Sequence, residues 1–267
     1  MRELWAFVRR DVQNEISYSF SFLLQILSIF PLVLLFLFIS RLFGNAMPAP
    51  LLAYGGSYFP FVLIGIAVQN YLMMALSSFA GSIRDAQLSG TLEAILTAPV
   101  RLPVFLLGSM LYAFVLNSLR IVIYLVFGIL VSGAGLEWTR LPSACLVMGL
   151  TIAAFSSLGI LSASFIILFK KGDPLNWMFN IASWLLGGVY YPVSVLPGWL
   201  REASEWIPMT HSLEALRLIL LSNHSLVSVG SHVLKLALWA SICLPVSYLC
   251  FRYALNRARA TGTLGHY

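Results

Sequence analysis

Long apolar segments separated by short polar stretches dominate the chain. They predict six membrane spans, at residues 17–43, 58–83, 103–131, 141–169, 175–191 and 233–253. All but the fifth exceed the ~20 residues that a helix needs to cross a bilayer. We therefore expect an all-α membrane protein with six transmembrane helices, forming a single domain over residues 1–267.

Apolar residues also recur at every fourth position at the start of the chain. Leu4, Val8, Val12 and Ile16 follow this spacing, with arginine and acidic residues between them. The pattern predicts an amphipathic helix at residues 1–16 that lies in the membrane interface. A signal peptide does not fit, because the segment contains acidic residues and the next apolar run is too long.

The fifth apolar segment is irregular. Residues 175–191 would form a helix of about 25 Å, which is marginal for a hydrocarbon core of ~30 Å. Gly187 and Gly188 weaken the helix, and Pro192 and Pro197 break it. Two alternatives are open: a full span with an ordinary outer loop, or a helix that ends within the membrane and re-enters as a hairpin. The hairpin makes residues 192–222 an external re-entrant and helical region, with short external helices after a broken fifth span.

The polar stretch at residues 84–101 lies between the second and third spans. Ser89 is suited to cap a helix, and Glu93 complements the positive end of the helix dipole. Leu92 and Leu96 share one face, and Pro99 ends the pattern. This predicts a short amphipathic helix that docks into a partner, whereas the alternative is a solvated loop with one helical turn.

Composition supports a membrane location. Of the 267 residues, 60% are hydrophobic and only 10% are charged, against about 25% charged residues in soluble domains. The net charge of +6 does not require a nucleic-acid partner, because basic residues set the topology of membrane proteins. Cys145, Cys243 and Cys250 share no short spacing, so we expect buried free thiols and no metal site.

The basic residues also predict the orientation. Ten Lys and Arg residues fall on one side of the predicted spans and five on the other, with Arg120 inside a span. The richer side contains both termini and the 84–101 stretch, which places them in the cytoplasm. We expect a multi-pass protein of the cytoplasmic (inner) membrane.

Two patches of sequence resemble the permeases of the ABC type-2 exporter family. One is Gly90-Thr91-Leu92-Glu93 with the residues up to Arg101, and the other runs from Tyr191-Pro192 through Ile207-Pro208 to Glu214-Ala215-Leu216-Arg217. The resemblance implies that the first patch docks the membrane subunit onto a separate ATPase. The implied docking residues are Arg84, Asp85, Gly90, Thr91, Leu92, Glu93, Leu96, Pro99 and Arg101.

The resemblance also implies an assembly and a function. The partners would be a dimer of ABC ATPase subunits, a second permease copy (a homodimer being favoured) and membrane lipid. ATP and Mg would bind to the ATPase, so this chain would be a transport subunit with no cofactor and no enzyme activity of its own. The cargo would be an amphipathic molecule such as a lipid-linked glycan, a lipid or a drug.

Arg120 is a charge in the middle of the third predicted span. An arginine there costs at least about 2.5 kcal/mol, so it should face the bundle interior or water. It either links to polar groups such as Gln69 and Asn70 or contacts an anionic group of the cargo. The residues that we expect along a substrate path are Gln69, Asn70, Asn117, Arg120, Tyr124, Tyr190 and Tyr191.

Missing motifs limit the other functions. The sequence contains no Gly-x-x-x-x-Gly-Lys-[Ser/Thr], so no P-loop binds ATP here. We expect the four histidines, His211, His224, His232 and His266, in outer loops or the tail. Few acidic residues or histidines fall in the spans, which disfavours a proton-coupled carrier. A secondary transporter and a membrane scaffold or enzyme without a transport role remain the alternatives.

Overall fold

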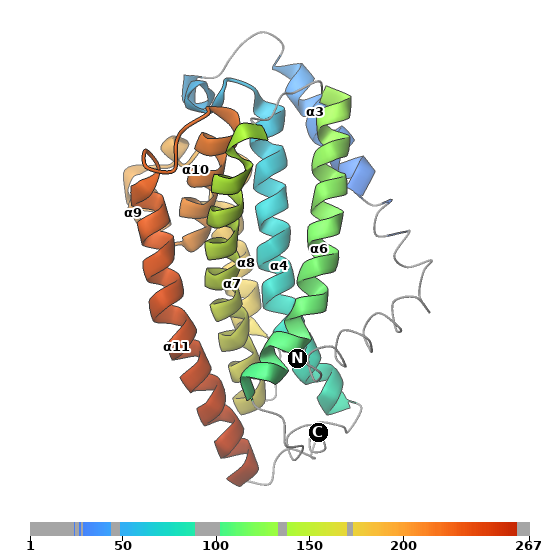
Figure 1. Ribbon diagram of the computed structural model, residues 1–267, viewed down its shortest axis with the longest axis vertical. Helices are drawn as coiled ribbons and strands as arrows, with labels where there is room; N and C mark the ends of the chain where they lie inside the picture. The colour runs from blue at the N-terminus through green and yellow to red at the C-terminus, as the bar shows by residue number, and fades with distance from the viewer. Residues whose placement is uncertain are drawn as a thin grey trace.

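The computed structural model describes residues 24, 27, 29–43, 49–88, 102–132, 138–169 and 173–260, where every regular element is helical. Four long helices lie side by side along the longest axis of the molecule (Figure 1). They are α4 (Tyr58–Leu88), α6 (Leu102–Ser132), α7 (Leu141–Phe169) and α11 (Gly230–Ala260). The shorter helices are α3 (Ile29–Leu42), α8 (Pro174–Leu186), α9 (Gly198–Ser204) and α10 (Pro208–Leu221). Single 3-10 turns are η1 (Ala49–Tyr54), η2 (Trp138–Arg140) and η3 (Val193–Val195).

The long helices correspond to predicted spans. Within the described residues, four segments are long and apolar enough to cross a membrane: Tyr58–Gly81, Ala113–Val131, Leu141–Phe169 and Gly230–Ala258. They match the second, third, fourth and sixth predicted spans. A shorter apolar helix, Phe30–Leu42, lies within the first, most of whose earlier residues are outside the described part. Six crossings therefore stay a prediction, as does the interfacial helix at residues 1–16.

The helix α4 forms the centre of the bundle. In its most apolar stretch 78% of the residues are buried, against 28% in α6 and 17% in α11. Because α4 is apolar on all sides, a position among other helices is the arrangement that its composition favours. Phe61, Leu72 and Phe79 on α4 are almost fully buried, as is Phe155 on the neighbouring α7.

A glycine allows α4 and α7 to approach closely. A Cβ atom added at Gly159 of α7 would lie 2.2 Å from the carbonyl oxygen of Ala75 on α4. Membrane helices commonly use small residues at such crossings, because two backbones then come into van der Waals contact. Gly149, an earlier residue of α7, faces open space and has no such constraint.

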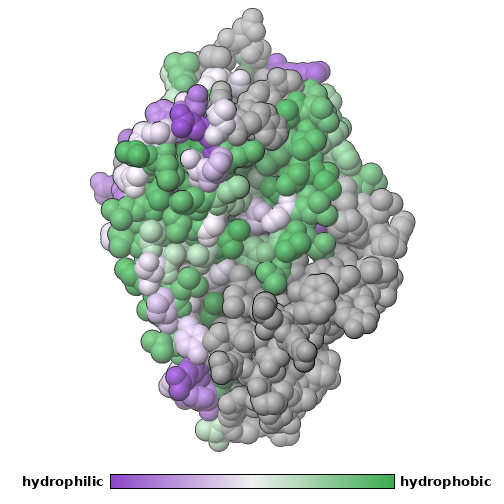
Figure 2. Space-filling view, in the orientation of Figure 1, coloured by the Kyte–Doolittle hydropathy of each residue, from purple (hydrophilic) through white to green (hydrophobic). Residues whose placement is uncertain are grey.

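The outward faces of the peripheral helices are apolar. Hydrophobic residues form a broad band across the middle of the visible surface, while hydrophilic residues gather toward its ends (Figure 2). On α6, Val115 and Val122 are more than half exposed, and Ile242 on α11 is equally open. An apolar surface of this extent is typical of a protein whose surroundings are lipid.

The cysteines lie on this outer surface and not in the core. Cys145 and Cys250 are exposed and Cys243 is partly exposed, so the prediction of buried thiols is wrong. The reason is that lipid-facing and core-facing positions of a membrane helix have the same apolar composition. All three cysteines are free, as predicted.

The fifth apolar segment contains a short helix. The side chain of Asp173 caps the start of α8 by accepting a hydrogen bond from the Asn176 amide at 3.0 Å. The helix ends at Leu186, followed by Gly187 and then by Gly188 with a positive φ of 77°. Its 13 residues span about 20 Å, well short of the ~30 Å hydrocarbon core. This early end agrees with the effect predicted for the two glycines.

The chain then returns into the bundle through α10. This helix packs against α4, α7 and α11, and most of its side chains are buried, including those of Met209, Leu213 and Ile219. Thr151 of α7 donates a hydrogen bond to Ser212 of α10 at 2.9 Å. An ordinary outer loop would not bury its residues in this way, so the segment from α8 to α10 forms a hairpin within the fold.

Candidate functional site

The predicted docking stretch begins inside α4. Arg84 and Asp85 belong to the last turns of this helix, which continues to Leu88, and no glycine or proline occurs between Arg84 and Gly90. The predicted loop at residues 84–101 is therefore helical at its start. The other predicted docking residues lie outside the described part of the chain: Gly90, Thr91, Leu92, Glu93, Leu96, Pro99 and Arg101. Their helix stays a prediction.

Polar side chains connect α4 to its neighbours at mid-height. Gln69 is buried, and its amide nitrogen donates a hydrogen bond to Asn180 of α8 at 3.0 Å. Two residues later, the Tyr71 hydroxyl lies 2.7 Å from the Ser118 hydroxyl of α6. Asn70, the next residue, is exposed.

The polar residues of α6 have different surroundings. Asn117 and Tyr124 are buried, at 9% and 3% exposure, whereas Arg120 is half-buried. Gln69 does not accept a hydrogen bond from Arg120, since its Oε1 has no donor within the described residues. The expected link between these two side chains is therefore not made.

The structure brings two of the predicted tyrosines together. Tyr190 packs against the apolar cluster that contains Tyr124, and its ring stacks on Phe36 with the centroids 5.4 Å apart. Tyr191 lies beside it in sequence, but its hydroxyl donates back to the Leu185 carbonyl at the end of α8. Tyr190 thus faces the bundle, while Tyr191 stabilises the end of its own hairpin.

Arg217 of α10 holds the broken part of the fold together, and it is only 1% exposed. Its guanidinium donates to the carbonyls of Gly188 at 2.7 Å, Val189 at 2.8 Å and Phe61 at 3.1 Å. The first two carbonyls follow the end of α8, where no further helical turn supplies amide donors. Buried backbone without helical partners needs such side-chain donors, so Arg217 stabilises the end of α8.

We call the contact of Arg217 with the carbonyls of Gly188, Val189 and Phe61 the Arg217 junction. It requires a small residue on α4. A Cβ atom added at Gly65 would lie 2.2 Å from the Val189 carbonyl oxygen and 2.7 Å from a guanidinium nitrogen of Arg217. The Arg217 guanidinium also lies over the Phe61 ring, 3.4 Å from its centroid. A planar five-donor group fits this arrangement of three carbonyls and a ring, which an ammonium group cannot match.

Glu214 lies one turn before Arg217 and connects α10 to the turn η1. The Tyr54 hydroxyl donates to the two Glu214 carboxylate oxygens at 2.8 and 2.7 Å. Burial raises the pKa of Tyr54, and the nearby Glu214 carboxylate raises it further. The hydroxyl therefore stays protonated and remains a donor at neutral pH.

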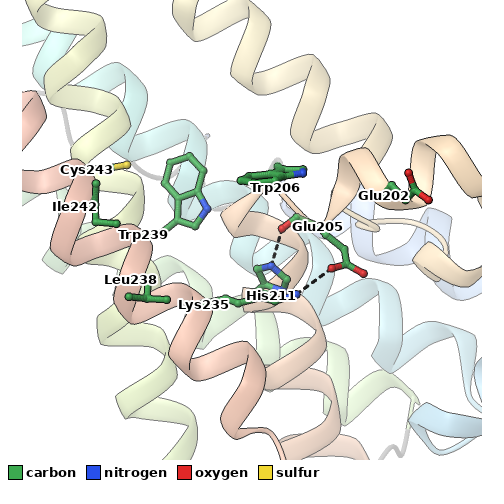
Figure 3. A pocket seen from close by; sticks show the side chains of 9 residues that line it. All are labelled: Glu202, Glu205, Trp206, His211, Lys235, Leu238, Trp239, Ile242 and Cys243. Carbon is green, nitrogen blue, oxygen red and sulfur yellow. Dashed lines mark hydrogen bonds and ion pairs between the residues drawn. The ribbon is translucent and has the colours of Figure 1, made fainter.

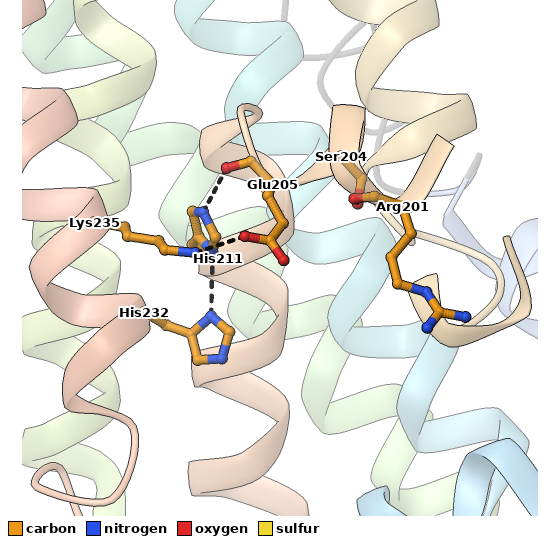
Figure 4. A network of polar contacts seen from close by, with 6 residues as sticks. All are labelled: Arg201, Ser204, Glu205, His211, His232 and Lys235. Carbon is orange, nitrogen blue, oxygen red and sulfur yellow. Dashed lines mark hydrogen bonds and ion pairs between the residues drawn. The ribbon is translucent and has the colours of Figure 1, made fainter. Parts of the chain in front are cut away.

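A second polar network joins the end of α9 to α10 and α11 (Figure 4). Lys235 of α11 forms an ion pair with Glu205 at 3.0 Å, which holds the pKa of Glu205 below its usual range. His211 of α10 donates from Nε2 to the Glu205 carbonyl at 2.8 Å. Its Nδ1 lies 3.1 Å from Nδ1 of His232.

This histidine pair was not expected from the sequence. His211 lies on α10 and is 2% exposed, and His232 lies in the first turn of α11, so the placement of both in outer loops is wrong. Burial lowers the pKa of His211. When both rings are neutral, the Nδ1 proton of His232 is donated to Nδ1 of His211. Within the described residues no group of three potential ligands could hold a metal ion.

The comparison with known proteins gives the family. The sequence profile of the ABC-2 type transporter family matches residues 2–221, which is most of the chain. The chain belongs to this family. It is the membrane-spanning permease of an ABC transporter, and ABC-2 permeases work with ATPase activity on a separate subunit.

Individual relatives agree with this assignment. The permease is 26% identical to Nodulation protein J of Rhizobium meliloti (strain 1021) over 190 residues, covering 70% of this chain and 71% of that protein. Nodulation protein J of Rhizobium leguminosarum bv. trifolii is 26% identical over 205 residues, 76% of this chain and 77% of its own. Linearmycin resistance permease protein LnrN of Bacillus subtilis (strain 168) is 22% identical over 194 residues. That match covers 71% of this chain and about half, 47%, of LnrN.

Proposed function

We propose that this permease moves an amphipathic substrate out across the cytoplasmic membrane, driven by ATP hydrolysis in a dimer of separate ATPase subunits. The arrangement of α4 carries the proposal. One end of α4 contacts the Arg217 junction through Phe61, and the other end leads into the predicted docking stretch after Arg84. The 24 residues from Phe61 to Arg84 span about 35 Å of helix. A displacement of the docking stretch by the ATPase would therefore be transmitted to the hairpin through one rigid helix, α4.

The predicted orientation gives this geometry a direction. The excess of basic residues on its side predicts that the docking stretch is in the cytoplasm, so the hairpin between α8 and α10 would close the outer end of the pathway. A closed outer end suits an exporter, which accepts its cargo from the cytoplasmic side. The name of the Bacillus relative, a linearmycin resistance permease, supports a drug as one member of the cargo class.

We further propose that two copies of the permease pair through α8. Its exposed residues follow helical spacing on one face, with Trp177 at 69% exposure, Ile181 at 40% and Trp184 at 53%. Within the described chain no element covers this face. On α4 and α6, Gln69 Oε1 and Asn117 Nδ2 are buried without hydrogen-bond partners in the described part of the molecule. A pathway between two copies would offer polar cargo atoms these unused groups.

Coupling is tested with the ATPase–permease complex in proteoliposomes. The double variant Leu92→Asp, Leu96→Asp should retain the folded spans but separate ATP hydrolysis from transport, or release the ATPase. Leu52→Asp is the control, because Leu52 lies on η1 and is already 60% exposed. Normal coupled transport by the double variant would contradict the docking assignment.

Pairing through α8 is tested by crosslinking in a background that lacks the three native cysteines. Ile181→Cys should give a covalent dimer on mild oxidation in membranes. Leu249→Cys is the matched control, because Leu249 is 60% exposed on α11. Equal crosslinking at both positions, or a dimer only through α11, would contradict the α8 interface.

A further inference from the structure

A groove of about 640 Å³ lies between α11 and the turn from α9 to α10. Figure 3 shows Trp206 of the turn and Trp239 of α11 pointing into it from its two walls. The α11 wall continues as an apolar surface through Leu238 and Ile242, which are 50% and 61% exposed. The volume lies in the ~300–1,000 Å³ range of small-molecule sites, and the groove is open toward the surroundings of the bundle.

The polar groups are confined to one end of the groove. Lys235 and Glu205 form their ion pair there, with His211 beside them, while the wall beyond Leu238 is apolar. The eight residues from Lys235 to Ile242 extend about 10 Å along α11. The groove is therefore amphipathic along the helix axis, with a charged end and an apolar end.

The charges on α11 indicate that the charged end of the groove lies at a membrane surface. Residues 236–251 contain no charged side chain and would span about 24 Å, and the long side chains at each end would cover the rest of the ~30 Å hydrocarbon core. Lys235 at one end and Arg252 at the other would then reach the two interfaces, where long basic side chains are favoured. The charged end of the groove thus lies at headgroup depth and the apolar wall at acyl-chain depth.

The charge of the groove discriminates between headgroups. Glu202 and Glu205 supply two carboxylates, and Lys235 supplies one ammonium. His211 is buried and bonded to a carbonyl, so the lining is net negative with a neutral imidazole. A purely anionic headgroup would meet repulsion, whereas a group with both an ammonium and a phosphate would find a partner for each. The faces of the two tryptophans also attract an ammonium.

We propose that this groove binds a zwitterionic phospholipid of the surrounding membrane. The phosphate pairs with Lys235, which is 44% exposed and retains donors beyond the one used by Glu205. The ammonium lies near Glu202 and Trp206, and one acyl chain follows Leu238 and Ile242. The site is separate from the transport pathway proposed above, so it stands even if the cargo or direction of transport is different.

The test uses the permease in lipid nanodiscs and quenching of tryptophan fluorescence by lipids with brominated acyl chains. Subtracting the signal of Trp239→Phe from that of the unmodified protein isolates the groove. Brominated phosphatidylethanolamine should quench this component at a mole fraction about fivefold lower than brominated phosphatidylglycerol needs. A fivefold difference in affinity corresponds to the free energy of about one exposed ion pair. Trp199→Phe is the control, because Trp199 is 72% exposed on α9 and does not line the groove, and its component should show no preference.

Charge variants then test the recognition. The double variant Glu202→Gln, Glu205→Gln should lose the preference for phosphatidylethanolamine, and Lys235→Gln should weaken quenching by both lipids. Equal quenching of the Trp239 component by the two lipids would show ordinary boundary lipid and overturn the proposal. A preference for phosphatidylglycerol, or a preference that survives the double variant, would also overturn it.

Discussion

Replacing Arg217 by methionine would remove the guanidinium while keeping an apolar side chain of similar length. The carbonyls of Gly188 and Val189 would then be buried without a donor, at about 1–3 kcal/mol each. The cost at the Phe61 carbonyl is smaller, because this carbonyl still accepts a hydrogen bond from a backbone amide of α4. The methionine variant avoids the desolvation penalty of a buried guanidinium, which offsets part of this loss of stability. We expect the free energy of unfolding to fall by roughly 2–4 kcal/mol.

Chemical unfolding in detergent micelles measures this change, with two comparison variants. Arg217→Lys keeps the charge but offers a single ammonium, so it should lose nearly as much stability as the methionine variant. Arg201→Met is the matched control, because exposed Arg201 donates to the Ser194 carbonyl at 2.8 Å. A surface change of this kind should cost less than about 0.5 kcal/mol. Equal stability of Arg217→Met and Arg201→Met, or full rescue by lysine, would refute the reasoning.

Three further outcomes follow from the structure. Gly65→Ala should lower the yield of folded permease, measured by size-exclusion chromatography, whereas Gly149→Ala, whose Cβ meets open space, should not. In sealed right-side-out cells, a cysteine replacing Ser194 should react with an impermeant thiol reagent and one replacing Gln87 should not; labelling at Gln87 would overturn the orientation. Burial lowers the pKa of His211, so the unfolded chain takes up a proton at a higher pH than the folded protein does. The contribution of the neutral His211 to stability should therefore be fully present above pH 6.5 and should decline as the pH falls below that value. The decline should be smaller in His211→Gln, and an unchanged pH profile would contradict this.

The long helices could be predicted because the apolar runs that form them have clear ends. The bounds of α7 match residues 141–169, and the glycines after Leu186 end α8 where the weakening was expected. The roles of single residues were harder to predict. Arg217 counted among the basic residues of the outer side and belonged to the second patch that resembles the family, but its burial was not predicted. The apolar residues around it, Leu216 and Leu218, are a signal of a buried link.

Other features leave no trace in one sequence. His211 and His232 are 21 residues apart and meet only because α10 folds back against α11. The hydrogen bond between Gln69 and Asn180 likewise depends on the packing of α4 against α8. Periodicity shows which residues share a face of one helix, but it does not show which helix that face contacts.

The bonds from Arg217 to the end of α8 have a consequence for biogenesis. A ribosome synthesises Gly188 and Val189 almost thirty residues before the arginine that satisfies their carbonyls. Until α10 is synthesised, these two carbonyls lack the donors that satisfy them in the folded protein. Water or another protein has to supply hydrogen bonds to them during this interval. Completion of the hairpin therefore waits for the synthesis of one arginine.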